Sequence, residues 1–299
     1  MTCYAPLYGT RDASGAVVFT AKKGTDFDVT VPCGQCVGCR ISRRSMWQLR
    51  CMHESSLHDR NCFVTLTYAD EHLPAHGSLQ YADVQKFFKR LRKAGHRFRY
   101  FVVGEYGDNT ERAHYHVLLF GYWPPDAVRV NSLSPSPHPV WSSSSLTCTW
   151  GLGQTHVMQL TKETAGYCAG YCFKKLCKGH PDYAQRYGVV NLQTGELNFR
   201  APEFARMSTS PGIGAHWYQR YGSTDVHQHD YCILDGRKLP VPKYYDRILE
   251  KRDPDRLAEL KESRESNSLK FKADNTPKRR VTKAEVATAK LSQQPRGKL

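Results

Sequence analysis

The segment from His114 to Gly121 constrains the fold most, because its residues are typical of a β-strand and it carries a His-x-His pair. Side chains alternate between the two faces of a strand, so His114 and His116 share one face with Leu118 and Phe120. Two imidazoles therefore project side by side from an otherwise apolar strand.

A carboxylate precedes this strand at a distance that suits a β-hairpin. An eight-residue loop from 106 to 113 would set Glu105 directly opposite His114, where cross-strand Cβ atoms lie ~5 Å apart. Two histidines and a carboxylate can hold one metal ion. If the loop is shorter, Asp108 or Glu111 takes the place of Glu105.

A His-x-His pair alone is weak evidence for a metal site, since a second pair, His227 and His229, stands in polar surroundings with no strand pattern behind it. The first pair differs in having an apolar strand around it and a turn with a carboxylate ahead of it. We therefore assign the metal to His114 and His116.

The segment from 161 to 178 predicts a helix, with Thr161 as N-cap and Gly179 just past the end. One face of this helix carries two phenols and two ammonium groups, those of Tyr167, Tyr171, Lys174 and Lys178. The opposite face is apolar, with Ala165, Cys168, Ala169, Cys172, Phe173 and Leu176. Aromatic residues one turn apart usually pack in a core, but here the apolar face is already occupied. The tyrosines therefore point elsewhere.

These features together suit phosphodiester transesterification. A metal ion would neutralise the scissile phosphate, and a tyrosine hydroxyl would attack the phosphorus. The product is a 5′-phosphotyrosine, which conserves the bond energy, so that rejoining needs no ATP.

The charge balance favours a nucleic-acid partner over a generic basic surface. Lys and Arg number 43 against 28 Asp and Glu, giving +15 and a pI near 9.3. Beyond residue 253 the chain becomes polar and basic without apolar periodicity, so we expect residues 262–299 to be disordered. The serine-rich stretch 131–145 is expected to be a surface loop. No apolar run approaches the ~18 residues of a membrane span, and the first six residues do not resemble a secretory signal.

The absence of a signal implies a reducing compartment, in which eleven cysteines indicate metal binding before disulfides. Cys33, Cys36 and Cys39 have the spacing of a zinc knuckle. The residues that can complete a tetrahedron are Cys51, His53 and Cys3, of which we take Cys51. Three free thiols in a turn are the alternative.

The coarse pattern predicts an α+β fold with a central antiparallel sheet. The expected strands lie near 62–68, 98–104, 114–121 and 154–160, and the helices that pack on the sheet near 81–93 and 162–178. We divide the chain into a Cys-rich segment with a helix at 1–58, a core at 59–180, an extension packed on the core at 181–261 and the tail at 262–299. The strand order is not readable from the sequence.

Several motifs resemble the HUH endonucleases, specifically the replication initiators of small single-stranded DNA phages of the gokushovirus type (Microviridae). They are Cys33 to Arg40, Phe63 to Tyr68, Gly104 to Gly107, Arg112 to His116, Tyr167-x-x-x-Tyr171, Ser210 to Gly214 with Trp217-Tyr218, and Pro242 to Asp246. The resemblance covers nearly all of residues 30–250. It departs from the family at Tyr115 and Ala113, neither of which is a ligand.

The resemblance implies a rolling-circle replication initiator that nicks and rejoins origin DNA with Mg²⁺ or Mn²⁺. The metal ligands would be His114, His116 and Glu105, and the catalytic residues Tyr167, Tyr171 and Lys174. The expected DNA contacts are Arg112, Lys175 and Lys178.

We expect single-stranded DNA, the viral origin, and a host helicase and polymerase as partners in the bacterial cytoplasm, with no membrane association. Two other functions compete with this one. A 2-His-1-carboxylate site could belong to an iron oxygenase or a hydrolytic zinc enzyme, but the tyrosines and lysines would then have no role. A non-catalytic, zinc-containing single-stranded DNA-binding protein would explain the charge but not the chelating strand.

Overall fold

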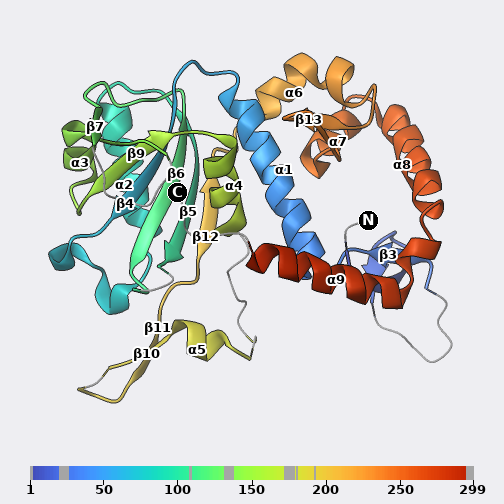
Figure 1. Cartoon of the computed structure of the whole chain (residues 1–299), viewed down its shortest axis with the longest axis horizontal. Helices are drawn as coiled ribbons and strands as arrows, with labels where there is room; N and C mark the ends of the chain where they lie inside the picture. Colours follow the sequence, from blue (N-terminus) through green and yellow to red (C-terminus); the bar gives the residue numbers. More distant parts are fainter. Residues whose placement is uncertain are drawn as a thin grey trace. The chain divides into compact units, whose positions relative to one another are not determined.

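The protein is described from a computed structural model. It describes residues 3–19, 27–107, 110–130, 138–171, 179, 181–191 and 193–293. The chain divides into two compact units, one of Trp47–Asp225 and one that combines Met1–Met46 with Val226–Gly297 (Figure 1). The four-segment division expected from the sequence stays a prediction.

A seven-stranded antiparallel sheet forms the centre of the Trp47–Asp225 unit, with strand order β12-β5-β6-β4-β9-β8-β7. Its strands are β4 (Asn61–Thr67), β5 (Arg99–Tyr106), β6 (Ala113–Phe120), β7 (Val128–Val130), β8 (Val140–Ser142), β9 (Thr155–Gln159) and β12 (Phe204–Met207). The four strands expected from the sequence are all present, and the predicted α+β class is confirmed. Short β7, β8 and β12 carry too few residues to show a period of two, which is why the sequence did not predict them.

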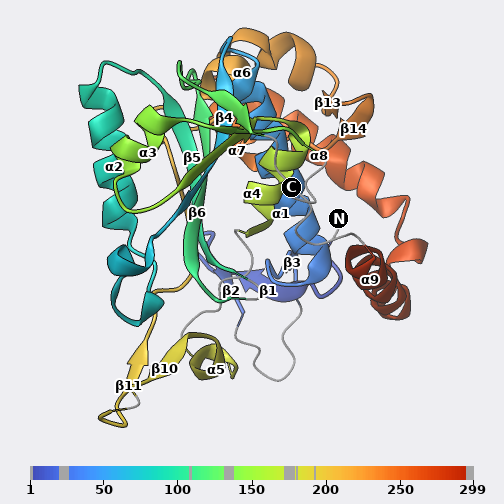
Figure 2. The same ribbon diagram turned by 60° about the vertical axis from the view of Figure 1, so that its left-hand side comes forward.

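Helices cover both faces of this sheet (Figure 2). On one face lie α2 (Tyr81–Lys93) and α3 (Ser144–Trp150); on the other lie α4 (Lys162–Tyr171) and the second half of α1 (Val37–Ser55). The period of the apolar residues determines which side of α2 is buried, because Val84, Phe87, Phe88 and Leu91 recur every three or four positions.

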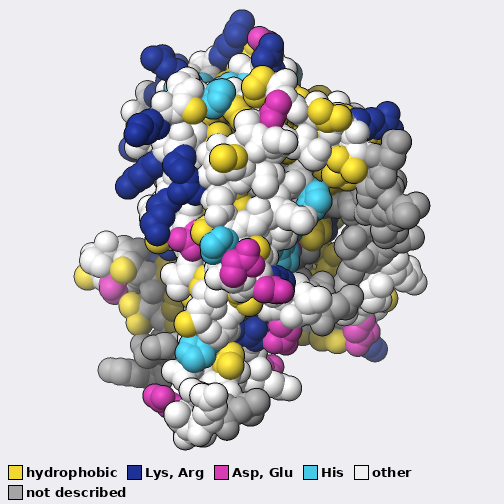
Figure 3. All heavy atoms as spheres, turned by 90° about the vertical axis from the view of Figure 1, so that its left-hand side faces the viewer, with side chains coloured by type: hydrophobic (Ala, Val, Ile, Leu, Met, Phe, Trp, Pro, Cys, Tyr) yellow, Lys and Arg dark blue, Asp and Glu magenta, His cyan; other side chains and the backbone are white. Residues whose placement is uncertain are grey.

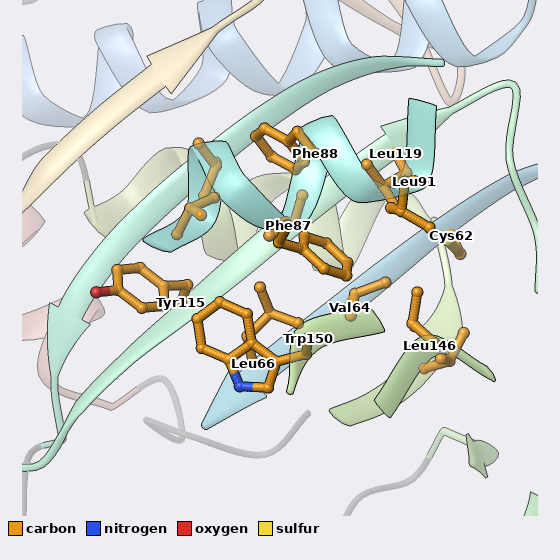
Figure 4. Close-up of a cluster of buried hydrophobic side chains, with 14 of the residues drawn as sticks. Cys62, Val64, Leu66, Phe87, Phe88, Leu91, Tyr115, Leu119, Leu146 and Trp150 are labelled. Atoms are coloured by element: carbon orange, nitrogen blue, oxygen red, sulfur yellow. The ribbon is translucent and has the colours of Figure 1, made fainter. Parts of the chain in front are cut away.

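The core beneath α2 and α3 is aromatic and apolar (Figure 4). Phe87 and Trp150 pack edge to face with ring centroids 6.0 Å apart. The indole Nε1 of Trp150 donates to the Thr67 carbonyl at 2.9 Å, so the one polar atom of this ring is satisfied and α3 is bonded to β4. Burying one such ring stabilises the fold by about 1.5–3 kcal/mol.

The serine-rich stretch is partly ordered, so the expectation of a loop over 131–145 is wrong for its described half. Residues 131–137 lie outside the described part, but β8 and the start of α3 follow them. Ser143 is the N-cap of α3 and accepts from Leu146 N, and the Asp126 carboxylate accepts from the hydroxyls of Ser143 and Ser145. Serine here starts a helix, as an N-cap residue does.

The remaining elements are short, apart from two C-terminal helices. In the Trp47–Asp225 unit they are η1 (Asp70–His72), η2 (Ala75–Gly77), α5 (Tyr183–Tyr187), β10 (Gly188–Val190), β11 (Leu197–Phe199) and α6 (Ala215–Tyr221), and η3 (Gly222–Val226) follows at the boundary. In the other unit they are β1 (Leu7–Arg11), β2 (Val17–Val18), β3 (Val29–Val31), β13 (Cys232–Leu234), β14 (Arg237–Leu239), α7 (Lys243–Glu250), α8 (Pro254–Leu269), η4 (Ala273–Asn275) and α9 (Pro277–Ser292). Within the described residues, no helix is both long enough and apolar enough to cross a bilayer.

The expected disorder of 262–299 is wrong for the described residues, because α8 continues to Leu269 and α9 follows. Both helices begin at a proline behind a capping side chain: Asp253 accepts from Arg256 N, and Thr276 accepts from Arg279 N. Local capping and ion pairs support these helices, whereas the sequence argument considered only apolar periodicity.

Candidate metal centre

The β5–β6 hairpin positions three side chains of the predicted metal site. Glu105 is paired with His114 across the two strands, as the eight-residue loop predicted, and His116 follows on the same face. One carboxylate oxygen of Glu105, Oε1, lies 2.8 Å from Nε2 of His114 and 2.8 Å from Nε2 of His116. The alternatives Asp108 and Glu111 are therefore not needed to complete this group.

The other nitrogen of each imidazole has a partner of its own. Nδ1 of His114 lies 2.9 Å from the Arg112 carbonyl, and Nδ1 of His116 lies 3.1 Å from the Thr65 hydroxyl. Because a carbonyl only accepts, Nδ1 of His114 must carry the proton, and in the neutral ring Nε2 is then a lone pair facing a carboxylate. Two electron-pair donors that face each other leave a place suited to a cation.

Burial strengthens the electrostatics of this group. Glu105 is 2% exposed and His116 is 6% exposed. Burial by itself raises the pKa of Glu105, but the hydrogen bonds from His114 and His116 outweigh it and hold the pKa below its ordinary value. The carboxylate is therefore ionised, the form that ligates a metal.

The three ligand atoms fit a divalent cation. They lie within 4.8 Å of one another, so one ion between them can contact all three. The set of two imidazoles and one carboxylate leaves open coordination positions for water or substrate. The arrangement can thus hold a Lewis acid beside a bound phosphate.

Tyr167 lies beside this site on α4. The helix begins with a reciprocal cap, in which Thr164 N donates to the Thr161 hydroxyl at 3.3 Å and Thr161 N donates to the Thr164 hydroxyl at 2.8 Å. Its buried face is the predicted one, with Ala165, Cys168 and Ala169 fully buried. The half-buried ring of Tyr167 stands edge-on to the ring of His116, with centroids 5.0 Å apart.

Tyr171 is the last described residue of α4, one turn after Tyr167, and its side chain is not described. Lys174, Lys175 and Lys178 lie outside the described residues. Their catalytic and DNA-binding roles stay predictions.

The comparisons with known proteins agree with the site. Residues 61–176 match the family model for replication-associated protein ORF2. The chain is 30% identical over 270 residues to replication-associated protein VP4 of Bdellovibrio phage phiMH2K, covering 87% of this chain and 80% of the phage protein. The chain belongs to the replication-associated proteins of small phages.

Two further members of this family match along most of the chain. Replication-associated protein ORF2 of Spiroplasma virus 4 is 31% identical over 254 residues, covering 79% of this chain and 73% of that protein. Replication-associated protein ORF4 of Chlamydia phage 1 is 24% identical over 233 residues, covering 75% and 55%. No solved structure matches the chain. The resemblance to phage replication initiators is therefore confirmed at the level of the family.

In this replication-associated protein, Arg112 is engaged with its own unit. Its guanidinium lies 2.7 Å from the Asp70 carboxylate and donates to the Tyr68 carbonyl at 2.8 Å. These bonds fix the backbone whose carbonyl meets His114. Arg112 thus shapes the site, and a contact with DNA stays a prediction.

Sequence analysis missed two residues on the face of the metal site. Thr65 on β4 is paired with His116 on one side and with His156 of β9 on the other, so these side chains form a row across three strands. The alternation in each strand gave a signal, but aligning the strands required their order and register. His156 is exposed and extends the site towards β9.

The structure corrects the predicted cysteine cluster. Cys3, Cys33, Cys36 and Cys39 place their sulfur atoms within 4.8 Å of one another. Cys51 is fully buried in the apolar core under α4 instead. Cys51 was the wrong choice because it lies in α1 more than three turns beyond Cys39, whereas Cys3 is brought back by the β1–β3 sheet.

The second His-x-His pair belongs to no cluster of three metal-ligating side chains among the described residues. His227 is buried and lies 3.0 Å from the Asp246 carboxylate, whereas His229 is exposed. This pair therefore serves as a comparison for the first.

Basic side chains gather on the outer side of α2, away from the metal site. Lys86, Lys89, Arg92 and Lys93 are exposed on this helix, and Figure 3 shows Lys and Arg side chains concentrated on the corresponding side of the molecule. The sequence predicted the positive charge but not its concentration on one helix.

Proposed function

We propose that this protein initiates rolling-circle replication by nicking and rejoining the viral origin. The observation that carries the proposal is the convergence of His114, His116 and Glu105, with the Tyr167 ring against His116. Membership of the phage replication-associated family supports it. Its place of action would be the cytoplasm of the bacterial host.

The chemistry follows from the residues that surround the site. A divalent metal ion, Mg²⁺ or Mn²⁺, would supply neutralisation of the negative charge on the scissile phosphate. The tyrosine oxygen forms a bond to phosphorus, the bond from phosphorus to the 3′ oxygen breaks, and the freed 3′ oxygen takes up a proton. The products are a 5′-phosphotyrosine and a 3′-hydroxyl, and the reverse attack rejoins the strand.

The partners of Nδ1 keep both imidazoles in one orientation during this reaction. The Arg112 carbonyl and the Thr65 hydroxyl each fix one ring. A preorganised ligand set needs no rearrangement when substrate arrives.

The test is a covalent adduct between the protein and a labelled single-stranded origin oligonucleotide, in the presence of Mg²⁺ or Mn²⁺, on a denaturing gel. His116→Ala should abolish the adduct but leave DNA binding within about twofold, because phosphates are bound mainly by dispersed Lys and Arg. EDTA should have the same effect on the wild-type protein.

The matched control is His229→Ala, which removes a histidine of the other His-x-His pair. It should form the adduct at the wild-type rate. Adduct formation by His116→Ala at the wild-type rate would overturn the proposal, as would loss of binding in parallel with loss of cleavage.

A further inference from the structure

The unit that contains the N-terminus has a second cluster of metal-ligating side chains, separate from the His114 site. It consists of the thiols of Cys3, Cys33, Cys36 and Cys39. We propose that these four cysteines form a structural zinc site, and that this site holds the N-terminal segment against the start of α1. The proposal does not depend on the nicking reaction.

The distances between the sulfur atoms suit one tetrahedral ion. A Zn–S bond of ~2.3 Å places the sulfurs of a tetrahedron ~3.8 Å apart. The Sγ of Cys3 lies 3.7 Å from that of Cys33 and 3.9 Å from that of Cys36. A disulfide requires ~2.0 Å, so the sulfurs have the spacing of shared ligands and not of bonded pairs.

Backbone amides point at three of these sulfurs. Tyr4 N donates to Cys36 Sγ, Cys33 N to Cys3 Sγ and Cys36 N to Cys33 Sγ, each at 3.3 Å. Donors around a sulfur stabilise the thiolate, which is the form that ligates a metal. They correspond to the outer-sphere hydrogen bonds that orient metal ligands.

The local chain geometry presents the cysteines in the spacing of a knuckle. Gly34 has φ +74°, which permits the turn after Cys33. Cys39 lies in the first turn of α1, where the helix dipole favours negative charge. The Arg43 guanidinium donates to the Gly34 carbonyl at 3.2 Å, so a cation lies close to a site that would carry a net charge of about −2 when four thiolates bind Zn²⁺.

The burial pattern gives an independent reason for a metal. Among the described residues from 3 to 46, only Cys3, Gly9, Gly38 and Cys39 are buried. The large apolar side chains around the β1–β3 sheet are exposed, including Leu7 at 46% and Phe19 at 50%. Two cysteines are thus the only buried residues with a side chain in the described part of this segment, and a region without an apolar core needs another source of stability.

The choice of zinc follows from the ligands. Four thiolates at tetrahedral spacing are typical of structural zinc, whereas Mg²⁺ and Mn²⁺ prefer oxygen. The two metal sites should therefore differ in selectivity, with zinc retained at the cysteines when Mg²⁺ exchanges at His114, His116 and Glu105.

The experiment measures metal in the full-length protein, expressed with a C-terminal tag in zinc-supplemented medium and exchanged into Mg²⁺ buffer. Elemental analysis should find about one zinc per chain. Cys3→Ser should lower that value to a small fraction. Cys51→Ser should keep it, which separates the structural assignment from the one made on sequence. His114→Ala should keep it as well, because the two sites are distinct.

Two measurements on the wild-type protein avoid any variant that fails to fold. Replacement of zinc by Co²⁺ should give the intense visible bands of tetrahedral thiolate coordination. Removal of the zinc by a strong chelator should speed amide exchange in residues 3–40 and leave β4, β5 and β6 protected.

The proposal is overturned if the wild-type protein binds no zinc, or binds iron in its place. It is equally overturned if zinc stays in Cys3→Ser but leaves Cys51→Ser, or if zinc leaves with His114→Ala.

Discussion

Tyr167 is the candidate nucleophile whose ring the structure describes, and its neighbour His116 is the more buried of the two histidines. The His116 side chain is 8% exposed, against 18% for His114. A tyrosine that stands on the ring of a buried ligand is held at the edge of the site, where a phosphate that binds to the metal would lie close to it.

The two tyrosines can be tested separately. Tyr167 and Tyr171 are one helical turn apart on α4, so either hydroxyl could reach the same phosphate. Each single Tyr→Phe change should still nick an oligonucleotide, with unequal rates, and the double change should be inert. Each single variant should also fail to release closed single-stranded circles from an origin plasmid in a replication assay, because release needs a second phenol. Full circle production by one variant would make that tyrosine a packing residue.

His53 offers a test of pH dependence. Its ring stacks on Trp217 with centroids 3.5 Å apart, and burial lowers its pKa to about 3. The folded state therefore favours the neutral ring, whereas the unfolded chain takes up a proton below its ordinary pKa of ~6.5. The stability linked to this ring is present above that pH and is lost as the pH falls towards 3.

His53→Phe keeps a stacked ring and removes the titration. The wild-type protein should lose about 2 kcal/mol more than the variant between about pH 7 and about pH 5, measured by urea unfolding. Comparing the pH change within each protein cancels any difference in packing. Equal losses in both proteins would show that His53 is protonated in the fold.

At the level of elements, a buried ion pair connects α1 to β5 and to the loop before α6. Glu54 is fully buried; its Oε1 accepts from Arg99 Nε at 2.6 Å and its Oε2 accepts from Gly214 N at 2.7 Å. Arg99 also donates to the Pro211 carbonyl at 2.6 Å. One carboxylate thus joins three segments that are distant in sequence.

Glu54→Gln should lower the free energy of unfolding by about 3 kcal/mol, because it leaves Arg99 largely buried without its counter-charge. The exposed Glu71→Gln is the matched control and should change it by less than about 0.5 kcal/mol. Urea unfolding of both variants measures the difference. A loss below about 1 kcal/mol in Glu54→Gln would show that the pair contributes little.

At the level of the whole molecule, the order found in the C-terminal segment changes how its role should be tested. Arg264 of α8 forms ion pairs with Asp230 and Asp246, so removing all residues after 261 would leave two carboxylates without their partner. A cut after Asn275 removes α9 and the basic residues beyond it while keeping these pairs.

A chain that ends at Asn275 should bind single-stranded DNA more weakly, and its affinity should depend less steeply on salt. Each lost phosphate contact should reduce the slope of log K against log salt by ~0.7. Lys278→Gln with Lys290→Gln, both exposed on α9, removes two charges from the intact helix and should reduce the slope by up to about 1.4. An unchanged slope in both proteins would exclude α9 from DNA binding.

The sequence by itself determined the features that depend on local periodicity. The alternation of 114–121 and the length of the loop before it placed Glu105 opposite His114, because a hairpin fixes its own register. The helical spacing of α2 and the apolar face of α4 were predicted for the same reason. Capped helices without an apolar face, such as α9, were missed because they lack that signal.

Tertiary structure alone decided which distant residues meet. Thr65 reaches His116 only because β4 lies beside β6, an order that no local pattern encodes. Cys3 replaces Cys51 in the thiol cluster because strand pairing returns the N-terminus to the start of α1, while Cys51 turns into the core. Local spacing restricts which side chains share a face, whereas contacts between segments far apart in sequence depend on how the whole chain packs.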